Sequence, residues 1–316
     1  MPRQMTLDAR LVADLTSDFA LSEKNLVFGF GLAGELLVAS RLSSEEVRVT
    51  VKGGGSVLKT LLDAPSDYRI LLQSGEASRR VELRGEHVPC AYVQPVPEGV
   101  LMVGARCGWR AQGAEHNAVV YDLSGQVVRR FTLGDGINDV RASPEGTLWV
   151  SYFDEGVVGN RGWRNPGPEP LGRSGLVQFD GAGQRLQEFD AEAAGATIVD
   201  AYALNLVSAQ EAWVNVYPGF SLVRVQAGQY QSWKTDTTGA SAMAVRGKRV
   251  ALFGGYQGDS LLRILELERG KPSARCLVEA RITLEGAPLG AHTPVTGVGP
   301  TLYFVEGRQV FALSDW

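Results

Sequence analysis

An internal repeat with a period of about 45 residues constrains the fold of this chain more than any other feature. Cys90–Val103 aligns without a gap on Ile137–Val150, at an offset of 47 and with Pro-Glu-Gly in register. Each copy predicts a strand, a tight turn at Pro-Glu-Gly and a second apolar strand, because Pro suits the first corner of a turn and Gly tolerates a positive φ. The chain is therefore expected to repeat one small β unit.

A second pair of segments completes that unit. Val119–Phe131 aligns on Val177–Phe189 at an offset of 58, and both read as hairpins with an aromatic residue and Asp before the turn and Gly-Gln after it. The larger offset places 11 extra residues between the second and third strands of the later copy. The unit is thus four antiparallel strands in about 45 residues, which is the size of one propeller blade.

Weaker copies extend the pattern over the whole chain and predict an all-β fold, a single β-propeller domain over residues 1–316. We expect six four-stranded blades, with approximate boundaries at 20–86, 87–136, 137–195, 196–238, 239–286, and 287–316 joined by 4–18. The stretch Glu45–Pro65 fits no blade cleanly. It is either an elaborated loop or, with its neighbours, part of a seventh blade.

The last blade lacks a fourth strand, since the chain stops at Trp316. An amphipathic stretch, Gln4–Asp18, is left over at the N-terminus, and we expect it to pair with the last blade as a strand and close the ring. Closure would cover the open sheet edge. The spacing of Leu7, Leu11 and Leu15 also fits a helix, which is the alternative.

Composition and charge exclude several classes of partner. The 31 basic residues are balanced by 35 acidic ones, and no Lys/Arg run exceeds two residues, so nucleic-acid binding is not expected. No apolar stretch approaches the ~18 residues of a membrane helix, and the start has no signal-peptide core. The three cysteines are scattered, which argues against a disulfide framework or structural zinc site. We expect a cytoplasmic protein that does not bind membranes.

The motif Ser-Pro-x-Gly-x-Leu-Trp-Val, followed by a hairpin with Phe-Asp-x-x-Gly, resembles blades of NHL-repeat, gluconolactonase/regucalcin and virginiamycin B lyase propellers of bacteria. The resemblance covers Cys90 to about Trp316 and is strongest over Ile137–Phe189. It implies the propeller architecture. Regucalcin-type enzymes hold one metal over the channel through carboxylates, and the lyase uses a His and a Glu with magnesium. Neither set can be placed residue by residue on this sequence, and no Ser/His/Asp order, Gly-x-Ser-x-Gly elbow or HExxH motif is present.

Loops that join second to third strands carry aromatic, arginine and carboxylate side chains. The triplet Gly-Trp-Arg occurs twice, in corresponding loops of two blades. Such loops at one end of a rigid scaffold suit a binding surface. The alternative is that the tryptophan rings only cover the blade ends, with arginines stacked on them. The predicted surface comprises Arg106, Trp109, Arg110, Asp154, Glu155, Trp163, Arg164, Tyr217, Phe220 and Tyr256.

A second group of polar residues falls at the start of the first strands of several blades. Oxygen ligands collect at propeller mouths, so Asn138, Asp139, Asp200 and His292 are candidates for a divalent cation site. The alternative is that these side chains cap their own turns and hydrogen-bond neighbouring blades.

These observations together predict a non-enzymatic binding or scaffold protein that recognises a protein or peptide through its loop-rich face and needs no cofactor. One alternative is a metal-dependent lyase or hydrolase that acts on a small molecule at the channel mouth, with a divalent cation held there. Another alternative is carbohydrate binding by the exposed aromatic residues.

Overall fold

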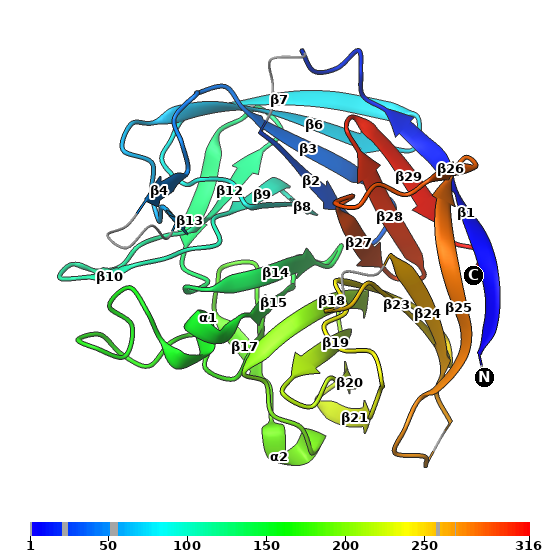
Figure 1. Ribbon diagram of the computed structural model, residues 1–316. Helices are drawn as coiled ribbons and strands as arrows, with labels where there is room; N and C mark the ends of the chain where they lie inside the picture. Colours follow the sequence, from blue (N-terminus) through cyan, green and yellow to red (C-terminus); the bar gives the residue numbers. More distant parts are fainter. Residues whose placement is uncertain (1, 21–24, 51–55, 257–259, 269) are drawn as a thin grey trace. The chain divides into compact units, whose positions relative to one another are not determined.

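The computed structural model describes residues 2–20, 25–50, 56–256, 260–268 and 270–316 (Figure 1). Strands dominate these residues, and the helices among them are the short α1 (Asp154–Val158) and α2 (Ala191–Ala194). The predicted all-β class is confirmed. No helix of the described chain is long and apolar enough to cross a bilayer. The chain forms two compact units, a mid-chain unit (Leu21–Phe189) and a terminal unit (Met1–Ala20 with Asp190–Trp316).

The mid-chain unit contains three four-stranded antiparallel sheets in which the strands follow one another in chain order. This up-and-down meander is the topology of a propeller blade. The sheets are β2 (Leu26–Phe30), β3 (Leu36–Arg41), β6 (Ser66–Ser74) and β7 (Ala77–Glu86); β8 (Tyr92–Val96), β9 (Gly99–Val103), β12 (Ala118–Asp122) and β13 (Val127–Phe131); and β14 (Ile137–Ala142), β15 (Leu148–Tyr152), β16 (Leu176–Phe179) and β17 (Arg185–Glu188).

The terminal unit contains one more meander of this kind and a nine-stranded sheet. The meander is β18 (Asp200–Ser208), β19 (Glu211–Tyr217), β20 (Ser221–Gln226) and β21 (Gln229–Trp233). The larger sheet runs in the order β22 (Ala242–Arg246), β23 (Arg249–Phe253), β24 (Leu261–Glu266), β25 (Arg275–Leu284), β1 (Arg3–Asp14), β29 (Gln309–Leu313), β28 (Thr301–Glu306) and β27 (Val295–Val298), with β26 (Ala287–Pro288) paired to β25.

Strand β1 joins the two halves of the larger sheet. Its first part, Arg3–Ala9, runs parallel to β25, and its second part, Arg10–Asp14, runs antiparallel to β29 (Figure 1). The N-terminal stretch is thus a strand and not a helix, and its pairing with β29 is present as predicted. The parallel pairing with β25 was not predicted. Closure of a ring by this strand stays a prediction.

The repeated aromatic-Asp motif has a direct physical role in the hairpins. Oδ1 of Asp122 accepts the backbone N–H groups of Ser124 and Gln126 at 2.8 and 2.9 Å. Oδ1 of Asp180 does the same for Ala182 and Gln184, at 2.9 and 2.8 Å. A short acidic side chain before the turn therefore satisfies two amides that the hairpin leaves unpaired. The two predicted hairpins are confirmed, since β12 pairs with β13 and β16 with β17.

The core lies between packed sheets and, in the terminal unit, also between the two halves of the nine-stranded sheet. In the mid-chain unit one cluster packs the first sheet on the second, and another packs the second on the third. In the terminal unit one cluster packs the sheet of β18–β21 on the nine-stranded sheet. Another, which includes Ala9 of β1, lies within the nine-stranded sheet, between its β22–β25 strands and its β28 and β29 strands. Close approach of first strands requires glycine: a Cβ on Gly29 would lie 1.8 Å from the Val93 carbonyl oxygen, and one on Gly297 would lie 1.6 Å from that of Met243.

The stretch Glu45–Pro65 lies between β3 and β6. Its described part contains a two-stranded ribbon, β4 (Arg48–Thr50) paired with β5 (Ser56–Leu58), and residues 51–55 lie outside the described residues. The ribbon extends a loop of the first sheet. The count of six blades, as against seven, stays a prediction.

Removal of residues 1–20 is expected to lower the melting temperature sharply or to make the protein insoluble. The segment contains β1 and the fully buried side chains of Leu15 and Phe19, which are 0% and 3% exposed. Burial of two such side chains contributes ~3–6 kcal/mol, against a net domain stability of ~5–15 kcal/mol. Thermal unfolding of the truncated and full-length chains tests this, with a chain lacking only Met1 and Pro2 as the control. Equal melting temperatures for all three would contradict it.

A buried carboxylate ties the first sheet of the mid-chain unit to the second. Glu86, at the end of β7, is 1% exposed and accepts two hydrogen bonds from the Arg130 guanidinium, at 2.8 and 3.0 Å. It also accepts from the Tyr121 hydroxyl and the Val88 amide. Burial alone would raise the pKa of Glu86, but these hydrogen bonds outweigh burial and hold the pKa below its usual value.

Glu86→Gln is expected to destabilise the protein by about 1–3 kcal/mol at pH 7, since hydrogen bonds to a charged group are lost. A lowered folded pKa means that Glu86 contributes its full stabilisation above the unfolded pKa of about 4.3, and loses it as pH falls through the folded pKa. The gap in melting temperature between wild type and variant should therefore narrow from pH 7 to pH 3. A gap that is constant over this range would contradict the assignment.

Candidate binding site

The predicted surface residues fall into two groups, one in each unit. In the mid-chain unit they lie in the loop between β9 and β12 and in the loop between β15 and β16: Arg106, Trp109, Arg110, Asp154, Glu155, Trp163 and Arg164. In the terminal unit they lie at the end of β19, shortly after β19 and after β23: Tyr217, Phe220 and Tyr256. Each group is described separately.

The two tryptophans of the repeated Gly-Trp-Arg triplet meet in the mid-chain unit. Their ring centroids are 5.4 Å apart and the rings are inclined at 60°, an edge-to-face contact. The Trp163 indole Nε1 donates to the carbonyl of Cys107 at 2.9 Å. The Trp109 ring lies against the backbone of Gly167, where a Cβ would be 2.5 Å from the ring. Trp163 is therefore held from beneath, and Trp109 lies half-buried above it.

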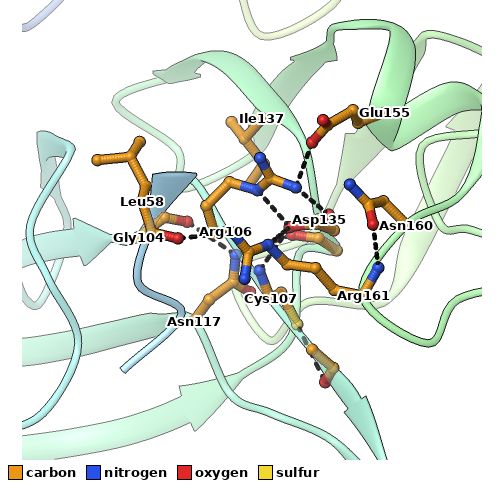
Figure 2. A network of polar contacts seen from close by, with 12 residues as sticks. Leu58, Gly104, Arg106, Cys107, Asn117, Asp135, Ile137, Glu155, Asn160 and Arg161 are labelled. Atoms are coloured by element: carbon orange, nitrogen blue, oxygen red, sulfur yellow. Dashed lines mark hydrogen bonds and ion pairs between the residues drawn. The ribbon is translucent and has the colours of Figure 1, made fainter. Parts of the chain in front are cut away.

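A buried ion pair holds the first of these loops in place (Figure 2). Arg106 is 6% exposed, and its Nε and Nη2 each donate to the Asp135 carboxylate at 2.8 Å. Asp135 is 3% exposed and also accepts the Cys107 amide at 2.8 Å. Asp135 lies between Gly134 and Gly136, both at positive φ, immediately before β14. The ion pair thus joins the loop after β9 to the start of the third sheet.

Further contacts extend this network to the second loop and to the first sheet. Arg106 also pairs with Glu155 in the first turn of α1, and its guanidinium lies 5.4 Å from the centroid of the Phe153 ring. Nε of Arg161 lies 4.0 Å from Asp135, and its Nη2 donates to the carbonyl of Leu58 at 2.6 Å. Burial, followed by the like charge of Arg106, lowers the pKa of Arg161. Loops of all three sheets are thereby fixed to one another.

A cleft of about 500 Å³ opens beside the tryptophan pair. This volume lies within the ~300–1,000 Å³ usual for ligand sites. The floor is apolar and the rim is charged. We call this site the tryptophan cleft; it is lined by Trp109, Ala114, Thr132, Trp163, Pro168, Glu169, Pro170, Leu171, Arg173, Arg185 and Glu188.

At one end of the cleft, the rim carries two arginines but one carboxylate. Glu188 forms ion pairs with both arginines: its carboxylate oxygens lie 3.5 Å from Arg173 Nε and 2.5 Å from Arg185 Nη1. At another point of the rim, Glu169 pairs with Arg164 at 2.9 Å. Two guanidinium groups on one carboxylate leave an excess of positive charge, and both arginines are about half exposed. This end of the cleft is complementary to an anionic group.

Two of the predicted surface residues, Arg106 and Trp163, are buried. Arg106 is 6% and Trp163 is 4% exposed, so neither offers contact area to a partner beyond the edge of Trp163 in the cleft. Both side chains instead support the loops that carry the exposed residues, through the contacts of Arg106 with Asp135 and of Trp163 with the Cys107 carbonyl. Arg110 is exposed and pairs with Glu115 at 2.9 Å. Asp154 is exposed in the first turn of α1.

In the terminal unit, Tyr217, Phe220 and Tyr256 meet one another and also Tyr202 of β18. We call these residues the tyrosine cluster. The centroid distances are 5.3 Å for Phe220–Tyr256, 5.4 Å for Tyr202–Tyr256 and 5.5 Å for Tyr217–Phe220. Tyr217 is 39% and Tyr256 is 57% exposed. The three sequence-predicted residues thus form one aromatic patch.

The candidate metal ligands belong to different units. Asn138 and Asp139 begin β14 in the mid-chain unit, whereas Asp200 begins β18 and His292 lies exposed before β27 in the terminal unit. Asp139 forms an ion pair with Arg141 at 2.6 Å and accepts a hydrogen bond from the backbone N–H of Val140 at 2.8 Å. Burial raises the pKa of Asp139. Among the described residues no three His, Cys, Asp or Glu side chains are grouped so as to hold a metal ion.

Several residues of the two sites were missed by sequence reasoning. The sequence contains a pattern that could have pointed to Asp135: an acidic residue between two glycines, just before a predicted strand. Tyr202 carries no sequence signal for the cluster, because it lies within β18 among other strand residues. The rim residue Arg173 lies in the longer segment before the second hairpin, where the repeat offers no equivalent position. Arg185 and Glu188 align on Val127 and Arg130 of the preceding copy, and that alignment gives no sign of a rim.

No protein-family model and no curated protein sequence matches this chain. Among solved structures the chain is similar to the PQQ-bound aldose sugar dehydrogenase of Streptomyces coelicolor, with 13% identity, a TM-score of 0.48 and coverage of 96% of this chain and 97% of that one. It is similar to the Cps50 (Swd1) β-propeller domain of Myceliophteria thermophila, with 11% identity, a TM-score of 0.47 and coverage of 92% and 96%. It is also similar to BamB of Moraxella catarrhalis, with 11% identity, a TM-score of 0.45 and coverage of 96% and 97%.

Asp135→Asn is expected to lower the free energy of unfolding by about 3–5 kcal/mol, because Arg106 is left buried without its counterion. Glu155→Gln removes the other partner of Arg106, but Glu155 is 41% exposed and the expected loss is below about 1 kcal/mol. Urea denaturation of both variants at pH 7 measures the difference. Equal losses in the two variants would contradict the central place given to Asp135.

Proposed function

We propose that this protein is a non-enzymatic binding protein that takes an extended peptide segment of a protein partner in the tryptophan cleft. The observation that carries the proposal is the meeting of Trp109 and Trp163 at the floor of a cleft of about 500 Å³. Tryptophan and arginine are the residues that most often dominate the energy of protein interfaces. Here a half-buried Trp109 is combined with the rim arginines Arg173 and Arg185.

The lining of the cleft favours a peptide over a sugar. Pro168, Pro170 and Leu171 continue the apolar floor around the tryptophan pair. Apolar side chains of an extended segment can bury against such a floor, and the two arginines that share Glu188 can bind an acidic side chain. The buried ion pair of Arg106 and Asp135 supports the proposal, because it fixes the loop before binding and reduces the entropy lost on association.

The finer features of the architecture are part of this proposal. We propose one propeller domain of six blades, closed by residues 4–18, in the cytoplasm. Support comes from the blade topology of the sheets in both units and from the pairing of β1 with β29. The first strands of neighbouring sheets also lie side by side within each unit, as β2 does with β8 and β18 with β22.

Trp109→Ala is expected to weaken peptide binding about 30-fold, which corresponds to an interface contribution of ~2 kcal/mol. The measurement is binding of the full chain to an array of 10-residue peptides, followed by titration of the strongest binders. Arg185→Glu, on the exposed rim, should selectively lose the peptides that contain acidic residues. Tyr256→Ala, in the other unit, is the control and should keep the wild-type affinities.

Identical peptide preferences for wild type, Trp109→Ala and Arg185→Glu would overturn the proposal. Because Trp109 packs on Trp163, the melting temperature of each variant is measured in parallel. A glycan array is the second measurement. Glycan binding that depends on Trp109, without peptide binding, would favour the carbohydrate alternative.

A further inference from the structure

We propose that the tyrosine cluster of the terminal unit binds a weakly hydrated organic cation, namely a quaternary ammonium group, independently of the tryptophan cleft. The cluster lies on β18, at the end of β19 and in the segments after β19 and β23. It comprises Tyr202, Tyr217, Phe220 and Tyr256, all within the terminal unit.

The rings are arranged with a half-buried centre and exposed flanks. Tyr202 and Phe220 are half-buried and 5.9 Å apart. Tyr256 contacts both of them nearly at right angles, at 82° and 89°, and Tyr217 contacts both at 71° and 62°. In an edge-to-face pair the ring that presents its edge keeps its faces free for another contact. Tyr217 and Tyr256 are the exposed members of the cluster, so a cation would approach it over these two rings.

The charge beside the cluster has the sign that a cation requires. Asp200 lies directly across from Tyr217 in the pairing of β18 with β19, so that their side chains leave the sheet close together. The Asp200 carboxylate therefore places a negative charge beside an exposed member of the cluster.

The polar groups of the cluster favour a cation that needs no hydrogen bonds. The hydroxyls of Tyr202 and Tyr256 are hydrogen-bonded to each other. A primary ammonium is strongly hydrated and requires acceptors for three N–H donors. A quaternary ammonium group has none to satisfy, and it is the ligand type that aromatic clusters recognise through their ring faces.

The backbone at Phe220 holds its ring in the cluster at a cost. Phe220 has a φ of +48°, a conformation that is unfavourable for a bulky residue. Its carbonyl accepts hydrogen bonds from Asn215 Nδ2 and Thr235 Oγ1, both at 3.0 Å. A glycine there would relieve the strain, yet a phenylalanine occupies the position and completes the cluster. Strain of this kind is typical of functional sites.

The test is a titration of the full chain with choline, followed through the tyrosine ring resonances by NMR. Saturable shifts of Tyr217 and Tyr256 are expected, and the neutral isostere 3,3-dimethylbutan-1-ol should bind at least about fivefold more weakly, since it lacks the charge. Tyr256→Ala and Phe220→Gly should each weaken choline binding about fivefold, which is ~1 kcal/mol of cation–π interaction. Asp200→Asn should also weaken it.

Two comparisons complete the experiment. Trp109→Ala should leave choline binding unchanged, so that failure of this site and failure of the tryptophan cleft are distinguishable. A peptide containing trimethyllysine is titrated in parallel with choline. The ligand that binds with the higher affinity identifies the source of the ammonium group. Equal binding of choline and its neutral isostere, or an unchanged affinity in both Tyr256→Ala and Phe220→Gly, would overturn the proposal.

Discussion

A four-stranded antiparallel sheet has two faces, and in this protein the apolar side chains of one sheet are buried only when a neighbouring sheet covers them. This constraint explains why clusters of buried residues lie between sheets in both units, and why another lies between the two halves of the nine-stranded sheet. It also explains the glycines at 29 and 297, where first strands approach so closely that a Cβ would collide with a carbonyl oxygen. The end sheet of such a series needs another partner, and in the terminal unit β1 provides hydrogen bonds to β25 and β29.

Packed sheets leave their loops free to vary, and here the loops are fixed by charge. The Arg106–Asp135 pair joins loops of the second and third sheets, and Arg161 extends the network to Leu58 of the first (Figure 2). A buried ion pair adds little net stability, because desolvation offsets the attraction, but it specifies one arrangement of the groups around it. In this protein that arrangement places Trp163 beneath Trp109 and shapes the tryptophan cleft.

The repeated Gly-Trp-Arg triplet shows both the value and the limit of sequence reasoning about the site. Its recurrence in corresponding loops placed both tryptophans on one predicted surface. The contact between their rings was not predicted. Their unequal exposure could not be predicted, because it depends on which indole finds a buried carbonyl, here that of Cys107. The tyrosine cluster shows the same limit, since Tyr202 of β18 meets Phe220 and Tyr256 only in the folded chain and not through any local pattern.

The sequence by itself determined the β class and the hairpins, and it favoured a strand over a helix at the N-terminus. These follow from short-range physics: the alternation of apolar residues, the Asp residues that cap the hairpin turns, and the Pro-Glu-Gly turns. Tertiary structure alone decided that β1 pairs with two strands, that Asp135 neutralises Arg106, and that rim charges surround the tryptophan pair. Each of these joins residues distant in sequence, and their free energies arise only when folding brings the groups together and removes water from them.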